Sequence, residues 1–124
     1  MIYLDSTLLK LQAVLAGAKT TNQLDCTVCF YDVPSQTKEG NEEYRGATKR
    51  TATNDTTDVD ICSAPVQSNV TRNIVGIWIY NKDTVSATVT VKTDDATTEF
   101  ILVKQALATT ETMEWTERTG WHVI

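Results

Sequence analysis

The 124-residue sequence lacks the hallmarks of several large classes of protein. It has no apolar run of the ~18 residues that a membrane-spanning helix needs. Acidic residues outnumber basic ones by 16 to 11, and the net charge of −5 argues against nucleic acid as a partner, because phosphate binding requires clustered Lys and Arg. Residues 1–5 contain no basic stretch followed by an apolar one, so we expect no secretory signal.

Residues that bind metals or carry catalysis are also scarce. Three cysteines are an odd number and a poor disulfide framework. Cys26 and Cys29 have the spacing of a metal or redox pair, but residues three apart in a strand point to opposite faces, so we interpret them as structural thiols. The single histidine, His122, has no identifiable partners for a catalytic triad. Asp58 and Asp60 lack a third ligand for a cation.

The sequence also contains no Gly-rich phosphate loop, no HExxH motif and no nucleophile elbow. We therefore predict that the protein is not an enzyme, with no catalytic residue, no bound metal and no cofactor. Reduced thiols are consistent with assembly in a cytoplasm.

Threonine is the abundant residue, with 22 copies against five glycines. Threonine is β-branched and favours strands, and its hydroxyl tolerates water, so the composition favours sheets with one wet face. The sequence predicts an all-β fold, an antiparallel two-sheet sandwich or jelly roll of about eight strands, formed by a single domain over residues 1–124.

Alternation of apolar and polar residues locates the strands. Residues 85–91 alternate most clearly, and with residues 99–107 they should form an antiparallel hairpin. Residues 73–81 are apolar on both faces, with Ile74 and Trp78 on one and Ile77 on the other, as is typical of a central or covered strand. Other strands are expected at residues 24–33, 57–64 and 121–124. The three Trp residues occupy apolar positions and are expected in the core.

Three segments are less regular. Ser6 and Gly17 are suited to begin and end a helix, but residues 9–15 alternate with a period of two, so we favour a strand there. Residues 117–120 form a tight turn with Gly120 at positive φ. Residues 35–54 are polar and are predicted to be a long loop, either an exposed insertion or a partner-binding loop.

Several segments together resemble small virion proteins of tailed bacteriophages, of the capsid decoration (cement) type. The strand entered by Thr71-Arg72-Asn73-Ile74-Val75-Gly76-Ile77 and the final Gly120-Trp121-His122-Val123 carry this resemblance. The other similar segments are residues 15–24, 31–33, 80–84, 87–91, 101–104 and 111–116.

The resemblance implies a structural protein that decorates and stabilises the outer surface of a bacteriophage capsid. It implies the major capsid protein as partner, a homotrimer at threefold or quasi-threefold positions, and assembly in the cytoplasm of the bacterial host. The alternative is a tail or fibre module that recognises the host surface, with the loop at 35–54 reading a glycan. In an N-terminal arm of about residues 1–8, the apolar Ile2, Tyr3 and Leu4 are expected to contact the capsid or a neighbouring subunit.

Overall fold

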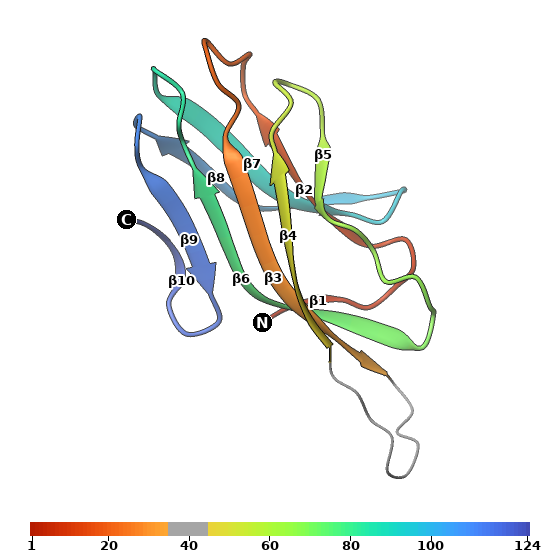
Figure 1. Cartoon of the computed structure of the whole chain (residues 1–124). Coiled ribbons are helices and arrows are strands. Elements are labelled where there is room, and N and C mark those ends of the chain that lie inside the picture. The colour runs from red at the N-terminus through yellow and green to blue at the C-terminus, as the bar shows by residue number, and fades with distance from the viewer. Residues whose placement is uncertain (35–44) are drawn as a thin grey trace.

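The computed structural model describes residues 1–34 and 45–124, which form two antiparallel sheets packed as a sandwich (Figure 1). The predicted all-β sandwich is therefore confirmed, with ten strands rather than about eight. In this described part of the chain, no helix is long and apolar enough to cross a membrane. The strands are β1 (Ile2–Leu4), β2 (Lys10–Leu15), β3 (Asp25–Pro34), β4 (Arg45–Ala52), β5 (Val59–Cys62), β6 (Val70–Tyr80), β7 (Ala87–Asp94), β8 (Glu99–Leu107), β9 (Thr112–Thr116) and β10 (Gly120–Val123).

The larger sheet has six strands in the order β10-β9-β6-β3-β4, and β1 also pairs with β6. Figure 1 shows β9, β6, β3 and β4 side by side from left to right. The smaller sheet has four strands in the order β5-β2-β7-β8. Strands β1, β4, β5, β8 and β10 each pair with one neighbour only, so they are the sheet edges among the described residues, where one row of backbone groups faces outward.

The core lies between the sheets and consists of the inward side chains of both. Its fully buried members include Leu11 of β2, Val28 of β3, Ile77 of β6 and Val91 of β7. The ambiguous segment 9–15 forms β2, because alternation places every second residue against this core. The predicted hairpin of β7 and β8 is confirmed, and so is the predicted positive φ of Gly120, at 68°.

Three β-bulges alter the faces that simple alternation predicts. At each bulge one extra residue has no partner of its own on the neighbouring strand: Ile61 in β5, Val75 in β6 and Leu102 in β8. The bulge at Val75 turns Ile74 toward the core, on the same side as Ile77, so their predicted placement on opposite faces was wrong. The bulged Val75 itself is 47% exposed.

Part of the predicted loop at 35–54 is instead the edge strand β4. It pairs along its whole length with β3, from Arg45 opposite Asp32 to Ala52 opposite Asp25. Its residues are polar because an edge strand with exposed side chains needs no apolar alternation, while its threonines keep a high strand propensity. The rest of that prediction, residues 35–44, lies outside the described residues.

Arg72 of β6 lies among buried groups between the two sheets. Its guanidinium donates to both carboxylate oxygens of Asp32, at 2.8 and 3.1 Å, and to the Ser63 carbonyl oxygen at 2.8 Å. It also lies 4.3 Å from the ring centroid of Phe30. The bond to Asp32 raises the pKa of Arg72, so the charge persists although the side chain is largely buried.

Candidate functional site

The outer face of the six-stranded sheet carries a group of aromatic side chains that we call the aromatic face: Tyr3, Tyr31, Trp78 and Tyr80. Strand pairing places them there, because residues paired across neighbouring strands point to the same side. Tyr3 of β1 and Tyr31 of β3 both pair with Asn73 of β6, which lies between them. Three of the four tyrosines in the chain thus lie on one face, and the fourth, Tyr44, is outside the described residues.

Trp78 and Tyr80 reach this face by alternation along β6. Their neighbours Ile77 and Ile79 are fully buried in the core, so the two aromatic residues point outward. Tyr80 is 38% exposed and Tyr3 52%. The expectation that all three Trp residues lie in the core is therefore wrong for Trp78. Trp115 is buried, and Trp121 packs against it with ring centroids 6.2 Å apart.

The indole of Trp78 has a fixed position on the sheet. Its six-membered ring lies over Gly76, so closely that a Cβ atom at Gly76 would be 2.3 Å from Cη2 of the ring. Its Nε1 donates a 2.7 Å hydrogen bond to Oε2 of Glu114 on β9. Because Gly76 has no side chain, the ring can lie directly over the backbone, and the hydrogen bond to Glu114 fixes its orientation. A ring that is already fixed loses less conformational entropy when a partner binds.

Polar groups surround the aromatic residues. The other carboxylate oxygen of Glu114, Oε1, lies 3.1 Å from Nε2 of His122 on β10. On the opposite side of Trp78, Thr27 of β3 and Arg50 of β4 continue the same row across the sheet. A row of threonine, arginine, carboxylate and imidazole groups beside an indole offers both hydrogen bonding and apolar contact.

Asn73 adds an unsatisfied acceptor to the aromatic face. It lies in the row between Tyr3 and Tyr31 and is 9% exposed. Its Oδ1 is buried and accepts no hydrogen bond within the described residues. A buried acceptor without a donor is costly, and a partner that supplies an N–H or O–H group removes that cost.

The three predicted N-terminal contact residues do not share one environment. Leu4 is fully buried in the core and Ile2 packs against that core. Only Tyr3 reaches the outer face, so the predicted contact with a capsid or a neighbour rests on its side chain. Sequence reasoning missed Trp78 as a surface residue. The available signal was Gly76, since a glycine inside a strand can mark a place where another group approaches the backbone closely.

The remaining candidate residues have partners within the protein. Cys26 is buried, and burial raises the pKa of its thiol to about 12, whereas the half-buried Cys29 contacts the Thr48 hydroxyl at 3.4 Å, so the predicted opposite faces are confirmed. Asp58 accepts from Lys92 and Asp60 from Gln12. Among residues 1–34 and 45–124, no three His, Cys, Asp or Glu side chains gather as a metal site.

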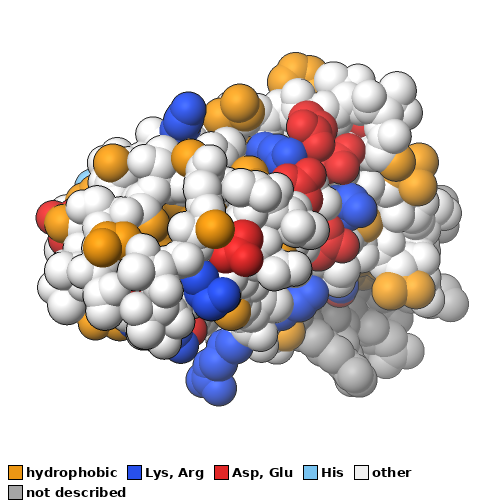
Figure 2. Space-filling model, turned by 90° about the horizontal axis from the view of Figure 1, so that it is seen from above, with side chains coloured by type: hydrophobic (Ala, Val, Ile, Leu, Met, Phe, Trp, Pro, Cys, Tyr) orange, Lys and Arg blue, Asp and Glu red, His pale blue; other side chains and the backbone are white. Residues whose placement is uncertain are grey.

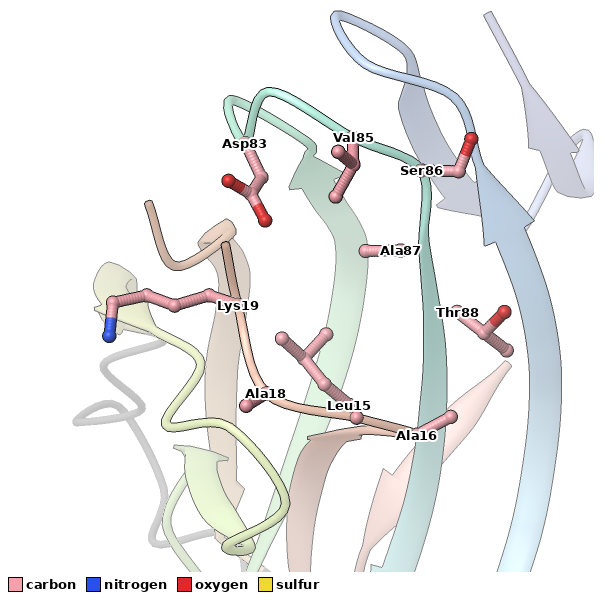
Figure 3. Close-up of a pocket in the computed structure, with 10 residues that line it drawn as sticks. Leu15, Ala16, Ala18, Lys19, Asp83, Val85, Ser86, Ala87 and Thr88 are labelled. Carbon is pink, nitrogen blue, oxygen red and sulfur yellow. The ribbon is translucent and has the colours of Figure 1, made fainter. Parts of the chain in front are cut away.

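A hollow of about 300 Å³ lies at one end of the sandwich, between residues 15–19 and residues 83–88 (Figure 3). Figure 3 shows Leu15 extending into it, while the ammonium group of Lys19 points away. Its lining combines aliphatic side chains with polar ones from Asp83, Ser86 and Thr88. Seen from this end, charged side chains of both signs lie intermingled and hydrophobic ones form small separate groups (Figure 2).

The one carboxylate in this hollow, Asp83, is already engaged. It accepts backbone N–H bonds from Thr20, Thr21, Asn22 and Thr84, at 2.8, 2.8, 3.1 and 2.8 Å. These bonds hold the pKa of Asp83 far below its usual range. Asp83 therefore ties the β2–β3 connection to the turn after β6, and we assign it a structural role.

Asp83→Asn should lower the melting temperature by about 5 °C at pH 7, because an amide oxygen cannot accept all four bonds. A lowered pKa stabilises the fold fully above the usual Asp pKa of about 3.9 and loses that effect as pH falls toward the lowered value. The difference in melting temperature between wild type and variant should therefore decrease below about pH 4. Thermal melts from pH 7 to 2 test this. Asp94→Asn is the matched control, because its one exposed turn bond, from the Ala96 N–H, can still be accepted by an amide oxygen. A difference in melting temperature that is independent of pH would contradict the prediction.

Of the aromatic face and the hollow, only the aromatic face has the composition of a contact surface, because Tyr, Trp and Arg are enriched where proteins bind one another. Comparison of the chain with protein-family models, with curated proteins and with solved structures found no match.

Proposed function

We propose that this protein is a structural virion component that binds the outer surface of a bacteriophage capsid and stabilises it. The observation that carries the proposal is the aromatic face, in which Trp78 is held by Gly76 and Glu114 next to exposed tyrosines. The resemblance of the sequence to capsid decoration proteins supplies the partner, the major capsid protein.

The physical argument concerns the joints between capsid subunits. Packaged DNA exerts outward pressure, and a two-sheet module that spans a joint adds buried area there. A stable contact buries roughly 800 Å² on each partner, and its centre is typically aromatic with a polar rim. The aromatic face has this arrangement, since Trp78 lies at its centre and Arg50, Glu114 and His122 surround it.

A second candidate function is host recognition by a tail or fibre module. The same observation favours it, because an indole face also stacks on the apolar face of a sugar while carboxylates and amides bind its hydroxyls. The loop first expected to read a glycan is now divided, with residues 45–52 in β4 and residues 35–44 outside the described residues.

Trp78→Ala should reduce retention on empty phage heads by about thirtyfold, the effect of losing a central anchor worth about 2 kcal/mol. The measurement is co-sedimentation of purified protein with empty expanded heads. Val66→Ala, which removes an 89% exposed apolar side chain from a loop after β5, is the control and should bind as wild type does.

Parallel binding to host cells and purified cell-surface glycan separates the two functions. Retention by heads that depends on Trp78 supports decoration, whereas retention by cells or glycan that depends on Trp78 supports recognition. Equal head binding of wild type and Trp78→Ala, with both variants folded by circular dichroism, would overturn the use of the aromatic face.

The N-terminal contact needs a point substitution rather than a truncation. Removal of residues 1–5 would also remove Leu4 from the core and β1 from β6, so weakened binding would not identify a contact. Tyr3→Ala leaves both in place. Electron microscopy of decorated heads tests the location in the virion, including the threefold positions that the resemblance implies.

A further inference from the structure

Strand β8 forms an open edge of the four-stranded sheet and carries exposed apolar side chains. It pairs with β7 on one side, and no strand of the described residues pairs with its other side. Phe100, Ile101 and Leu102 are 65%, 66% and 36% exposed. An edge of this kind is a template for pairing with another strand, unless charges or a covering segment block it.

The bulge at Leu102 determines which side chains share a face. Val103 pairs with the buried Val91 and points inward, so Lys104 points outward. Ile101 pairs with Lys92 and points outward, and Glu99 does so too, since its carboxylate accepts from Lys92 at 2.9 Å. In a regular strand two residues five positions apart point to opposite faces, but the extra residue brings Glu99 and Lys104 onto the same one.

The segment Glu99-Phe100-Ile101-Leu102-Val103-Lys104 is therefore complementary to a second copy of itself. The two copies are related by a twofold axis that passes between Ile101 and Leu102. Antiparallel pairing with an identical strand about this axis places Glu99 opposite Lys104 of the partner subunit, and Phe100 opposite Val103 of the partner subunit. Both members of each pair lie on the same face. Opposite charges meet at both ends, and apolar residues meet in the middle.

The ion pairs on this face support the same arrangement. Lys92 lies between Asp58 and Glu99, at 2.9 Å from each, so the cluster contains one more negative than positive charge. Lys104 forms no ion pair with any residue of the described ranges. A second copy brings its Lys104 to the cluster that lacks a cation.

We propose that β8 is a homodimer contact, in which the β8 edges of two copies of this chain pair antiparallel about a twofold axis and join the four-stranded sheets. This contact lies on the opposite sheet from the aromatic face and does not depend on the capsid proposal. It implies an even number of copies, and the trimer expected from the resemblance is the competing outcome. A twofold contact is isologous and closed, so it also hides the edge from further association.

Sedimentation velocity of the purified chain over a range of concentrations tests the proposal. We expect a species of twice the 13.8 kDa chain mass to increase with concentration. Ile101→Lys places two ammonium groups beside the axis and should raise the dissociation constant by about a hundredfold. Val75→Lys, at an exposed β-bulge of the other sheet, is the matched control and should dimerise as wild type does.

The response to salt provides a second readout that does not depend on burying a new charge. Lys104→Glu is at an exposed position and sets a carboxylate opposite Glu99 of the partner subunit, so its dimer should be weaker than wild type by about tenfold at low salt. Added salt should weaken the wild-type dimer and strengthen that of the variant. A wild-type monomer at every concentration, a trimer, open-ended aggregates, or an Ile101→Lys protein that associates normally would each overturn the proposal.

Discussion

Asn81→Ala is expected to lower the free energy of unfolding by about 3 kcal/mol and the melting temperature by roughly 10 °C. Asn81 is fully buried at the end of β6. Its Nδ2 donates to the carbonyl oxygens of Val85 and Leu107, at 3.0 and 2.9 Å, and its Oδ1 accepts from the Asp83 N–H at 2.9 Å. Truncation leaves one donor and two acceptors without partners, and each costs about 1 kcal/mol.

The effect should be large because the bond to Leu107 connects segments distant in sequence, while the bonds to Asp83 and Val85 hold the turn after β6. Leu107 ends β8, 26 positions away, while the backbone of Asn81 also bonds Thr110 and Glu111 of the next turn. Asp83, oriented by Asn81, holds residues 20–22. Loss of the Asn81 side chain thus loosens three connections at one end of the sandwich: those to the end of β8, to the turn before β9 and to residues 20–22.

Chemical denaturation monitored by circular dichroism measures the change. Asn22→Ala is the matched control, because the Asn22 amide is exposed and makes one bond of 3.2 Å to the Lys82 carbonyl oxygen, so its loss should cost less than about 1 kcal/mol. Equal effects of the two substitutions would show that the buried bonds of Asn81 contribute no more than an exposed one.

The sequence predicted the elements near Asn81 better than the bonds that join them. Alternation identified β6, β7 and β8, because burial against one core imposes a period of two on each strand. The bond from Asn81 to Leu107 was not predicted, because a contact between residues 26 positions apart depends on how the strands pair, and no local pattern encodes pairing.

The errors in the predicted faces have one physical cause. A β-bulge inserts a residue without changing the composition of a strand, so alternation counted from one side of it is reversed on the other. This moved Ile74 into the core, and it also placed Glu99 and Lys104 on one face. Likewise β4 is an edge strand without an apolar pattern, so alternation could not identify it or its pairing with β3.

Trp78 was assigned to the core because large apolar residues are usually buried, whereas here glycine makes room for the ring on the outer face. Gly76→Ala tests that account. Alanine at an ordinary strand position is more stable than glycine by about 0.5–1 kcal/mol, because glycine loses more conformational freedom on folding. At Gly76 the new Cβ would lie 2.3, 2.7 and 3.0 Å from three atoms of the Trp78 ring. The ring must move, and we expect a net loss of about 2 kcal/mol.

Gly46 of β4 offers the matched control. It lies in the same sheet, and the nearest atom to a Cβ there is the Phe30 carbonyl oxygen, at 4.0 Å. Gly46→Ala should therefore leave stability unchanged or raise it by up to about 1 kcal/mol. A double-mutant cycle isolates the cause, because in a Trp78→Ala background the clash is absent and Gly76→Ala should no longer destabilise.

Binding of a partner to the aromatic face should depend on the position of the Trp78 ring rather than on the stability of the fold. Displacement of the indole breaks its 2.7 Å bond to Glu114 and removes the fixed orientation, so Gly76→Ala should weaken retention on empty heads nearly as much as Trp78→Ala does. Gly46→Ala should retain wild-type binding. If Gly76→Ala is destabilised yet binds heads normally, the fixed indole is not the anchor of the contact.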